Sequence, residues 1–251
     1  MNKILKVKAR QVFDSRGNPT VEAEVFTKKN SASAICPSGA STGSYEAFEK
    51  RDKNNKKYLG KSVLNAIKLV NTKISKKLKG QNVHNQERID SLMINLDDTK
   101  QKTYLGANSI LAVSMAVKKL SAKEKKIPLY KNFLIKKNFK LPLPLMNIIN
   151  GGAHANNGLR IQEFMIRPDK AKNFSEAIRI CYLVIKSLGN LIKKKGLSTS
   201  VGDEGGFAPM INSNNQALEL ITSAIRKSGF INGKDVSICL DVAANELYKK
   251  D

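Results

Sequence analysis

Four short polar segments in the second half of the chain carry side chains suited to acid–base or metal chemistry. His154 follows a Gly-Gly turn, so its imidazole can point into a cleft, although a loop histidine without a role is the simpler alternative. Glu163 lies in an otherwise apolar strand, where a carboxylate is costly unless it is paired, binds a metal or faces a cavity. The alternative for Glu163 is a surface charge at the end of a strand.

The other two segments add carboxylates. Asp203 and Glu204 are adjacent and are flanked by three glycines, which predicts an exposed loop that a ligand can approach closely. Such a loop suits metal coordination or proton transfer, and an ordinary acidic turn is the alternative. Asp241 follows a short apolar run and is a weak signal by itself. Together these carboxylates indicate Mg²⁺, a hard cation that prefers oxygen ligands and is often shared with substrate phosphate.

The elements that must position these groups alternate between strands and helices. An apolar run ends in a sharp break at Asn150-Gly151-Gly152, and two long stretches with helical periodicity follow a second strand. Strands interleaved with helices, with polar residues just past the C-terminal ends of the strands, predict part of a (β/α) barrel. The expected strands are 141–149, 161–166 and 236–240, and the expected helices are 174–195 and 215–227.

The first half of the chain predicts a separate α+β unit. Alternating residues at 7–13 and 20–26 flank turn residues at 14–19, which predicts a β-hairpin. The small residues of 36–44 predict a loop that can approach a ligand, and composition alone does not separate this interpretation from a linker. Apolar stripes between Val63 and Ile74 and over 108–120 predict helices.

Composition limits the class of protein. The chain has 251 residues, and its 44 Lys and Arg against 21 Asp and Glu give a formal charge of +23. The lysines are spread along the chain, aromatic residues make up 6% and Trp is absent, so we expect a solvated basic surface rather than a specific nucleic-acid site. No apolar stretch is long enough for a membrane span, and no secretory signal is visible. Three scattered cysteines indicate a reduced, cytoplasmic setting: Cys36, Cys181 and Cys239.

Several blocks of sequence, in order from end to end, resemble the enolase family. They begin with Asp-Ser-Arg-Gly-Asn-Pro-Thr-Val-Glu, include Met-Asn-Ile-Ile-Asn-Gly-Gly and Val-Gly-Asp-Glu-Gly-Gly-Phe-Ala-Pro, and end with Leu-Asp-Val-Ala-Ala. Several such blocks in the right order are far more specific than any one motif. The blocks occupy residues 14–22, 37–43, 106–114, 146–152, 162–165, 201–209 and 240–244.

The resemblance implies a fold and a reaction. The implied fold is an N-terminal α+β domain, residues 1–135, followed by the first portion of a TIM-type barrel of the enolase kind, residues 139–251, which begins β-β-α-α. The implied reaction is the reversible, Mg²⁺-dependent dehydration of 2-phosphoglycerate to phosphoenolpyruvate in glycolysis. In that reaction, proton abstraction beside a carboxylate builds a doubly charged enolate. Metal ions must stabilise that charge, as they do in the enolase superfamily.

The resemblance also implies roles for individual residues. Asp241 resembles a ligand of the first metal, and Ser41 resembles the loop residue that binds the second metal as the loop closes over substrate. Glu204 resembles the general acid that helps the 3-hydroxyl group leave, and Glu163 supports it. The residues that resemble substrate-side groups are His154, Gln162 and Glu163.

The chain departs from the family pattern in length, because a complete barrel takes about 250 residues. The family's two further carboxylate ligands, its lysine base and its substrate-holding Arg-Ser and lysine lie in later strands, so we expect a truncated chain that is inactive alone. Arg10 and Glu22 resemble dimer contacts, which implies a homodimer at full length. Cell-surface display is compatible with the family. The alternative function is a non-catalytic, basic binding module derived from an enolase.

Overall fold

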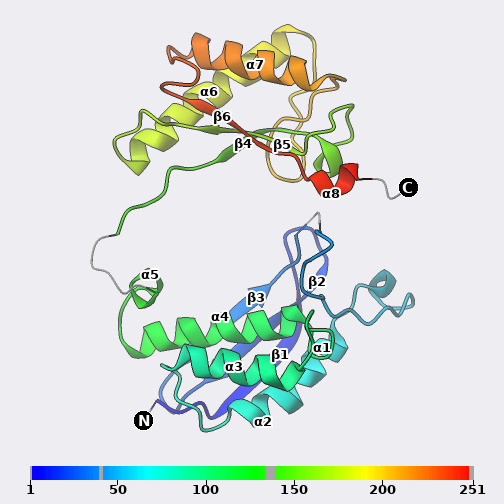
Figure 1. Ribbon diagram of the computed structural model, residues 1–251, viewed down its shortest axis with the longest axis vertical. Coiled ribbons are helices and arrows are strands. Elements are labelled where there is room, and N and C mark those ends of the chain that lie inside the picture. The colour runs from blue at the N-terminus through cyan, green and yellow to red at the C-terminus, as the bar shows by residue number, and fades with distance from the viewer. Residues whose placement is uncertain (1, 40–41, 134–138, 249–251) are drawn as a thin grey trace. The chain divides into compact units, whose positions relative to one another are not determined.

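The computed structural model describes residues 2–39, 42–133 and 139–248. The chain folds as two compact units, residues 1–137 and 138–251. Each unit has a hydrophobic core of its own, with its own sheet (Figure 1).

The sheet of the first unit has three antiparallel strands in the order β1-β2-β3. The predicted hairpin is confirmed by β1 (Lys6–Phe13) and β2 (Pro19–Phe26), which pair along their whole length. The turn between them is fixed by Asp14, whose Oδ1 accepts the amide N–H groups of residues 16 and 18. The third strand, β3 (Ser31–Cys36), had no predicted counterpart, because its small residues give little hydrophobic alternation.

Helices cover this sheet and supply most of the core. One continuous helical stretch runs through α1 (Leu64–Leu69), the π-helical η2 (Val70–Ile74) and α2 (Ser75–Leu78), where the apolar stripe predicted a helix. The helix α4 (Ala107–Glu124) packs on β2 and β3 and buries an alanine- and valine-rich face between sheet and helices. The other helices of the unit are η1 (Tyr58–Gly60), α3 (Gln86–Asp97) and α5 (Leu129–Asn132).

The second unit contains a three-stranded sheet with two long helices on one side of it (Figure 1). The strands are β4 (Met146–Asn150), β5 (Glu163–Arg167) and β6 (Ser237–Asp241), and β5 lies between the other two. The helices α6 (Phe174–Lys194) and α7 (Asn214–Lys227) confirm the two predicted helices to within one residue. Short helical turns complete the unit: η3 (Gly152–His154) and α8 (Ala244–Leu247).

The core of the second unit lies between the strands and the two helices. Phe164 and Ile166 of β5 and Ile149 of β4 are buried against the apolar stripe of α6. Side-chain caps begin both helices: the Asn173 side chain accepts the amide N–H of residue 176, and the Ser213 hydroxyl accepts that of residue 215.

Two predictions about these strands were wrong. The expected strand 141–149 starts only at Met146, because Pro142 and Pro144 have no N–H group to donate to a ladder. The general prediction that polar residues lie just past the C-terminal ends of strands was also wrong for Glu163, which lies within the expected strand 161–166 and is the first residue of β5.

Strand direction explains why Glu163 nevertheless lies beside the other groups. The chain between β4 and β5 contains only a one-turn helix, so it reverses direction and β5 runs antiparallel to β4. Two successive helices, α6 and α7, separate β5 from β6, and β6 is again antiparallel to β5. The C-terminal ends of β4 and β6 therefore lie at the same end of the sheet as the beginning of β5.

Candidate functional site

The candidate site begins with a row of three polar residues at one end of the sheet of the second unit. Asn150 of β4 is registered with Glu163 of β5, and Glu163 is registered with Asp241 of β6. Side chains of directly paired residues on adjacent strands lie close together on one face. The carboxylates of Glu163 and Asp241 are thus neighbours, although they are 78 positions apart in the sequence.

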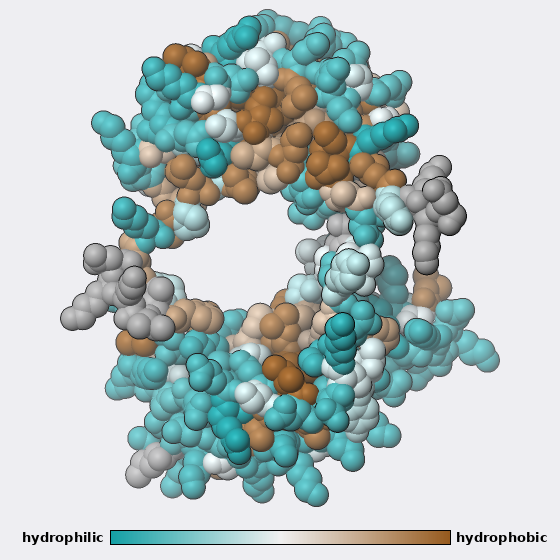
Figure 2. Space-filling model, viewed as in Figure 1, coloured by the Kyte–Doolittle hydropathy of each residue, from teal (hydrophilic) through white to brown (hydrophobic). Residues whose placement is uncertain are grey.

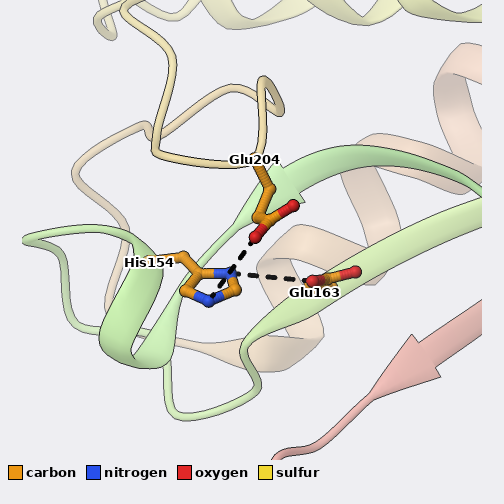
Figure 3. Close-up of side chains that lie close together, drawn as sticks. All are labelled: His154, Glu163 and Glu204. Atoms are coloured by element: carbon orange, nitrogen blue, oxygen red, sulfur yellow. Dashed lines mark ion pairs between the residues drawn. The ribbon is translucent and has the colours of Figure 1, made fainter. Parts of the chain in front are cut away.

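His154 is brought to this row by the tight turn that follows β4. The Gly151 amide donates to the Gln162 carbonyl at 2.9 Å, and a Cβ at Gly151 would lie 2.5 Å from the carbonyl oxygen of Ile161. A side chain at position 151 therefore cannot be accommodated without moving backbone, which explains the glycine. The imidazole of His154 is 3% exposed, with Nδ1 3.6 Å from the Glu163 carboxylate (Figure 3).

Glu204 reaches the same histidine from the glycine-rich loop 201–206. Its carboxylate oxygen lies 3.9 Å from His154 Nε2, on the opposite ring nitrogen from Glu163 (Figure 3). The loop is held against β4, because the Phe207 amide donates to the Ile148 carbonyl and the Asn150 amide donates to the Phe207 carbonyl, each at 2.9 Å. The Asp203 amide also donates to the carbonyl of His154. These bonds fix the position from which Glu204 extends.

The glycines of this loop are needed for its close approach to β4. A Cβ at Gly206 would lie 2.4 Å from Asn150 Oδ1 and 2.8 Å from Asn147 Oδ1. A Cβ at Gly202 would lie 2.5 Å from the His154 carbonyl oxygen. Only a loop without side chains at these two positions can pack so closely on the strand.

Negative charge is concentrated around Glu163. Burial first, and then the charges of Glu204 and Asp241, raise the pKa of Glu163 above its ordinary value, while His154 acts in the opposite direction. The Glu163 side chain is 17% exposed and that of Glu204 is 45% exposed, so the former is the more strongly desolvated of the two. Two carboxylates beside one imidazole, with a third carboxylate on the neighbouring strand, form a group that can bind a cation or exchange protons.

The structure brings together five of the six residues that the sequence predicted for the site. His154, Glu163 and Glu204 form one cluster, Gln162 is buried next to Glu163 in the chain, and Asp241 is the cross-strand partner of Glu163. Asp241 is exposed, and its Oδ1 accepts the Ala243 amide N–H at 2.9 Å. Ser41, predicted to bind a second metal, lies outside the described residues.

Sequence reasoning missed the two asparagines of β4. Asn147 and Asn150 have buried amide groups that form no hydrogen bond within the described parts of the chain, and both face the loop that carries Glu204. The available signal was an asparagine at each end of an otherwise apolar Asn-Ile-Ile-Asn segment. A buried amide without a partner is costly, so these positions mark a polar pocket rather than ordinary core.

The other histidine and the predicted dimer contacts belong to the first unit. His84 Nε2 is 2.7 Å from Asn2 Nδ2 and its Nδ1 is 2.9 Å from Ser121 Oγ, so this imidazole is part of a local hydrogen-bond network. Arg10 of β1 is directly opposite Glu22 of β2 in the strand pair, and the two side chains form an ion pair. That contact, together with the charge of Glu22, raises the pKa of Arg10.

Comparison with known proteins is clear for both units. Residues 4–133 match the family model "Enolase, N-terminal domain", and residues 138–251 match "Enolase, C-terminal TIM barrel domain". The chain is 79% identical over all 251 residues to a curated protein named enolase from Pelagibacter ubique (strain HTCC1062). The chain spans 60% of the length of that relative. Among the described residues, no helix is both long and apolar enough to cross a membrane.

Proposed function

Because the chain belongs to the enolase family, we propose that it contributes part of the site for the reversible, Mg²⁺-dependent dehydration of 2-phosphoglycerate to phosphoenolpyruvate. One observation carries most of the weight: Glu163, Glu204, Asp241 and His154 meet at one end of one sheet. In barrels of this class, catalytic groups gather at one rim from several different strands. The substrate is a small phosphorylated acid, and the residues described here form one side of its proposed site.

The proposed roles follow from exposure and charge. Glu204 extends from an exposed loop and is the general acid that protonates the departing 3-hydroxyl group. Glu163 lies on β5, next to the strand β4 on which that loop packs. Its raised pKa favours the protonated form, which can share a proton with a neighbouring carboxylate. His154 and the buried Gln162 lie on the substrate side, where their polar groups would orient the phosphorylated acid.

The donor set around Asp241 fits Mg²⁺. Asp241 is an exposed carboxylate with one oxygen already bonded to a backbone amide, so its other oxygen is available to a hard cation. Repulsion among Glu163, Glu204 and Asp241 is the kind of unfavourable charge that a divalent cation relieves. When bound, Mg²⁺ would stabilise the negative charge that develops on the substrate carboxylate. Ser41 is proposed as the ligand of a second ion on the basis of the family pattern alone.

The remaining catalytic groups are proposed to come from the part of the family's sequence that the chain does not match. In the enolase pattern the lysine base, two further carboxylate ligands and the substrate-holding Arg-Ser and lysine follow the strand that ends at Asp241. We therefore expect this chain to be inactive alone and active with a polypeptide that supplies those groups.

The experiment is a complementation assay. The chain is mixed with a separate polypeptide made from the part of the Pelagibacter ubique relative that it does not cover, and 2-phosphoglycerate consumption is followed with Mg²⁺. We expect turnover from the mixture and none from either piece. Turnover by the chain alone, or a folded complex without turnover, would contradict the proposal. Glu204→Gln is expected to reduce turnover by about 10² to 10⁴-fold, whereas Glu219→Gln, an acidic residue on α7, serves as the matched control.

Family membership supports four further proposals. The two compact units are the two domains of the family, with a boundary between residues 135 and 139. The complete protein acts as a homodimer to which Arg10 and Glu22 contribute, and it works in the cytoplasm. Display at the cell surface is the remaining family-based proposal.

The basic surface favours one alternative, a non-catalytic binding module. Figure 2 shows hydrophilic side chains over much of the visible face of each unit, and the formal charge of the chain is +23. Such a surface attracts polyanions without specificity, and added salt weakens that attraction. Binding to one partner at fixed stoichiometry that persists at high salt would favour the module, whereas binding that salt abolishes would favour the enzyme.

A further inference from the structure

His154, Glu163 and Glu204 form a cluster with the donor types of a transition-metal site. One ligand atom from each residue, a ring nitrogen or a carboxylate oxygen, lies within 4.8 Å of the other two. Three protein ligands that combine imidazole and carboxylate, with one position left open, are the usual environment of accessible Zn²⁺. Metal binding would need only small movements of these side chains to bring their ligand atoms onto one ion.

The hydrogen bonding of His154 points in the same direction. Its imidazole is 3% exposed, yet neither ring nitrogen has a hydrogen-bond partner in the parts of the chain that the structure describes. His84 differs, because both of its ring nitrogens lie within hydrogen-bond distance of a neighbouring side chain. Buried polar groups in proteins are nearly always satisfied, so an imidazole with two open nitrogens between two carboxylates indicates a place for a ligand.

The chemistry of the donors selects the metal. Mg²⁺ favours oxygen ligands and keeps several waters, whereas imidazole suits Zn²⁺ and its neighbours in the Irving–Williams order. The carboxylate–imidazole contacts at 3.6 and 3.9 Å are too long for hydrogen bonds. A metal on one nitrogen would allow the other nitrogen to donate to the remaining carboxylate, an arrangement common around metal-bound histidine.

We propose that His154, Glu163 and Glu204 bind Zn²⁺ or a similar borderline divalent cation at a site separate from the magnesium ligand Asp241. The ion takes one ring nitrogen of His154 and carboxylate oxygens of the two glutamates. It therefore occupies the carboxylate assigned as the general acid and stops the proposed dehydration. That inhibitory consequence rests on the proposed function, whereas binding of the metal does not.

The direct test uses Zn²⁺ alone and the full chain without a histidine tag. The chain has two histidines, so ¹H–¹⁵N NMR resolves two imidazoles, one of which reports on the site and the other on the rest of the fold. One equivalent of Zn²⁺ is expected to shift the His154 ring signals and leave those of His84 in place, and millimolar Mg²⁺ is expected to shift the His154 signals much less than Zn²⁺ does. Equal shifts of both imidazoles, or a shift of His84 alone, would overturn the proposal.

Variants assign the ligands. Calorimetric Zn²⁺ affinity is expected to fall by at least about tenfold in His154→Gln and in Glu204→Gln, and to be unchanged in the matched control His84→Gln. Glu204 extends from an exposed loop, so Glu204→Gln keeps the test valid if His154→Gln does not fold. Unchanged affinity in Glu204→Gln would refute the site.

The absorption spectrum of bound Co²⁺ distinguishes binding at this site from binding by the cysteines. Co²⁺ bound to nitrogen and oxygen ligands shows weak visible bands, whereas thiolate ligation adds an intense near-ultraviolet band. We expect the first pattern for this chain, lost in His154→Gln. A thiolate band that persists in that variant would assign the metal to a free cysteine and contradict the proposal. Failure of the complementation assay with a normal Zn²⁺ titration would reject the enzymatic function but not the metal site.

Discussion

Glu163 and Asp241 are direct cross-strand partners at one end of the sheet of the second unit. The pairing places two carboxylates side by side at the end of the sheet, and Glu204 adds a third from the loop that packs on β4. Like charges directly opposite each other destabilise a sheet, so the fold tolerates a cost at this position. Costs of this kind are typical of sites that bind an ion or a charged substrate.

The titration of Glu163 is the first prediction. Burial and the charges of Glu204 and Asp241 raise its pKa, so carbon-detected NMR should show this carboxyl titrating above the ordinary glutamate range. Glu124, whose pKa is lowered chiefly by a hydrogen bond from Thr27, should titrate below that range in the same spectra. Glu204→Gln should lower the pKa of Glu163 more than Asp241→Asn does. A Glu163 carboxyl with an ordinary or lowered pKa would show that the three groups do not interact.

The same shift predicts how stability depends on pH. The folded chain keeps the proton of Glu163 to a higher pH than the unfolded chain, so the folded state binds more protons between the ordinary and the raised pKa. The second unit should therefore lose stability as pH rises through that window, and Glu163→Gln should remove this loss. Amide hydrogen exchange in β5 measures the effect. Equal pH dependence in the parent and the variant would argue against it.

Packing of the glycine loop gives a third prediction. Gly206→Ala places a methyl group 2.4 Å from Asn150 Oδ1, so we expect a loss of about 1–3 kcal/mol from overpacking. Shortening the obstructing side chain should recover part of this loss, so Gly206→Ala combined with Asn150→Ala should be less destabilised than the sum of the two single variants. Strict additivity in chemical denaturation would show that the added methyl group does not press on the Asn150 side chain.

Two leucines on one helix test the core of the first unit. Leu120 of α4 is buried, whereas Leu111 of the same helix is about half exposed. Leu120→Ala should cost about 2–5 kcal/mol, because it leaves a cavity, and Leu111→Ala should cost about 0.5 kcal/mol. Urea denaturation followed by far-ultraviolet circular dichroism distinguishes them. Similar losses at both positions would mean that α4 packs differently.

The outer strand of the second unit predicts self-association. Among the described residues, β6 has a strand partner only on the β5 side, and Leu240 on it is 43% exposed. Apolar side chains reach the surface of this unit in Figure 2, and an open strand edge is a template for pairing with another chain. Leu240→Lys should reduce association measured by analytical ultracentrifugation, and Leu64→Lys, at 44% exposure on α1, is the matched control. A monomeric parent chain would contradict the prediction.

Sequence patterns were sufficient to predict a helix or strand where one physical signal dominated. The apolar stripe of α6 places that helix within one residue, and the alternation on both sides of the turn at 14–19 places the hairpin. The pattern was weak for β3, whose small residues bury little surface, and that strand depends on pairing with β2. No helix was predicted over α3, although the signal was present: Ile89, Leu92 and Met93 are buried at helical spacing in a polar stretch.

The limits of prediction from sequence are clearer at the candidate site. Residue types alone identified His154, Glu163 and Glu204 as chemically unusual, because each stands in a segment where a polar group needs a reason. Residue types could not show that β5 runs antiparallel to both of its neighbours, which brings Glu163 at its beginning to the C-terminal ends of β4 and β6. The burial of Asn150 against the loop depends on tertiary packing for the same reason.

The decisive measurement of the proposed activity is the turnover of 2-phosphoglycerate by a single-chain chimera. The chimera joins this chain to the part of the Pelagibacter ubique relative that it does not cover. The chimera is expected to form phosphoenolpyruvate in a Mg²⁺-dependent reaction whose rate falls by about 10² to 10⁴-fold in Glu204→Gln and is also strongly reduced in Asp241→Asn. A folded chimera without turnover, or one whose turnover both substitutions leave unchanged, would contradict the proposed activity.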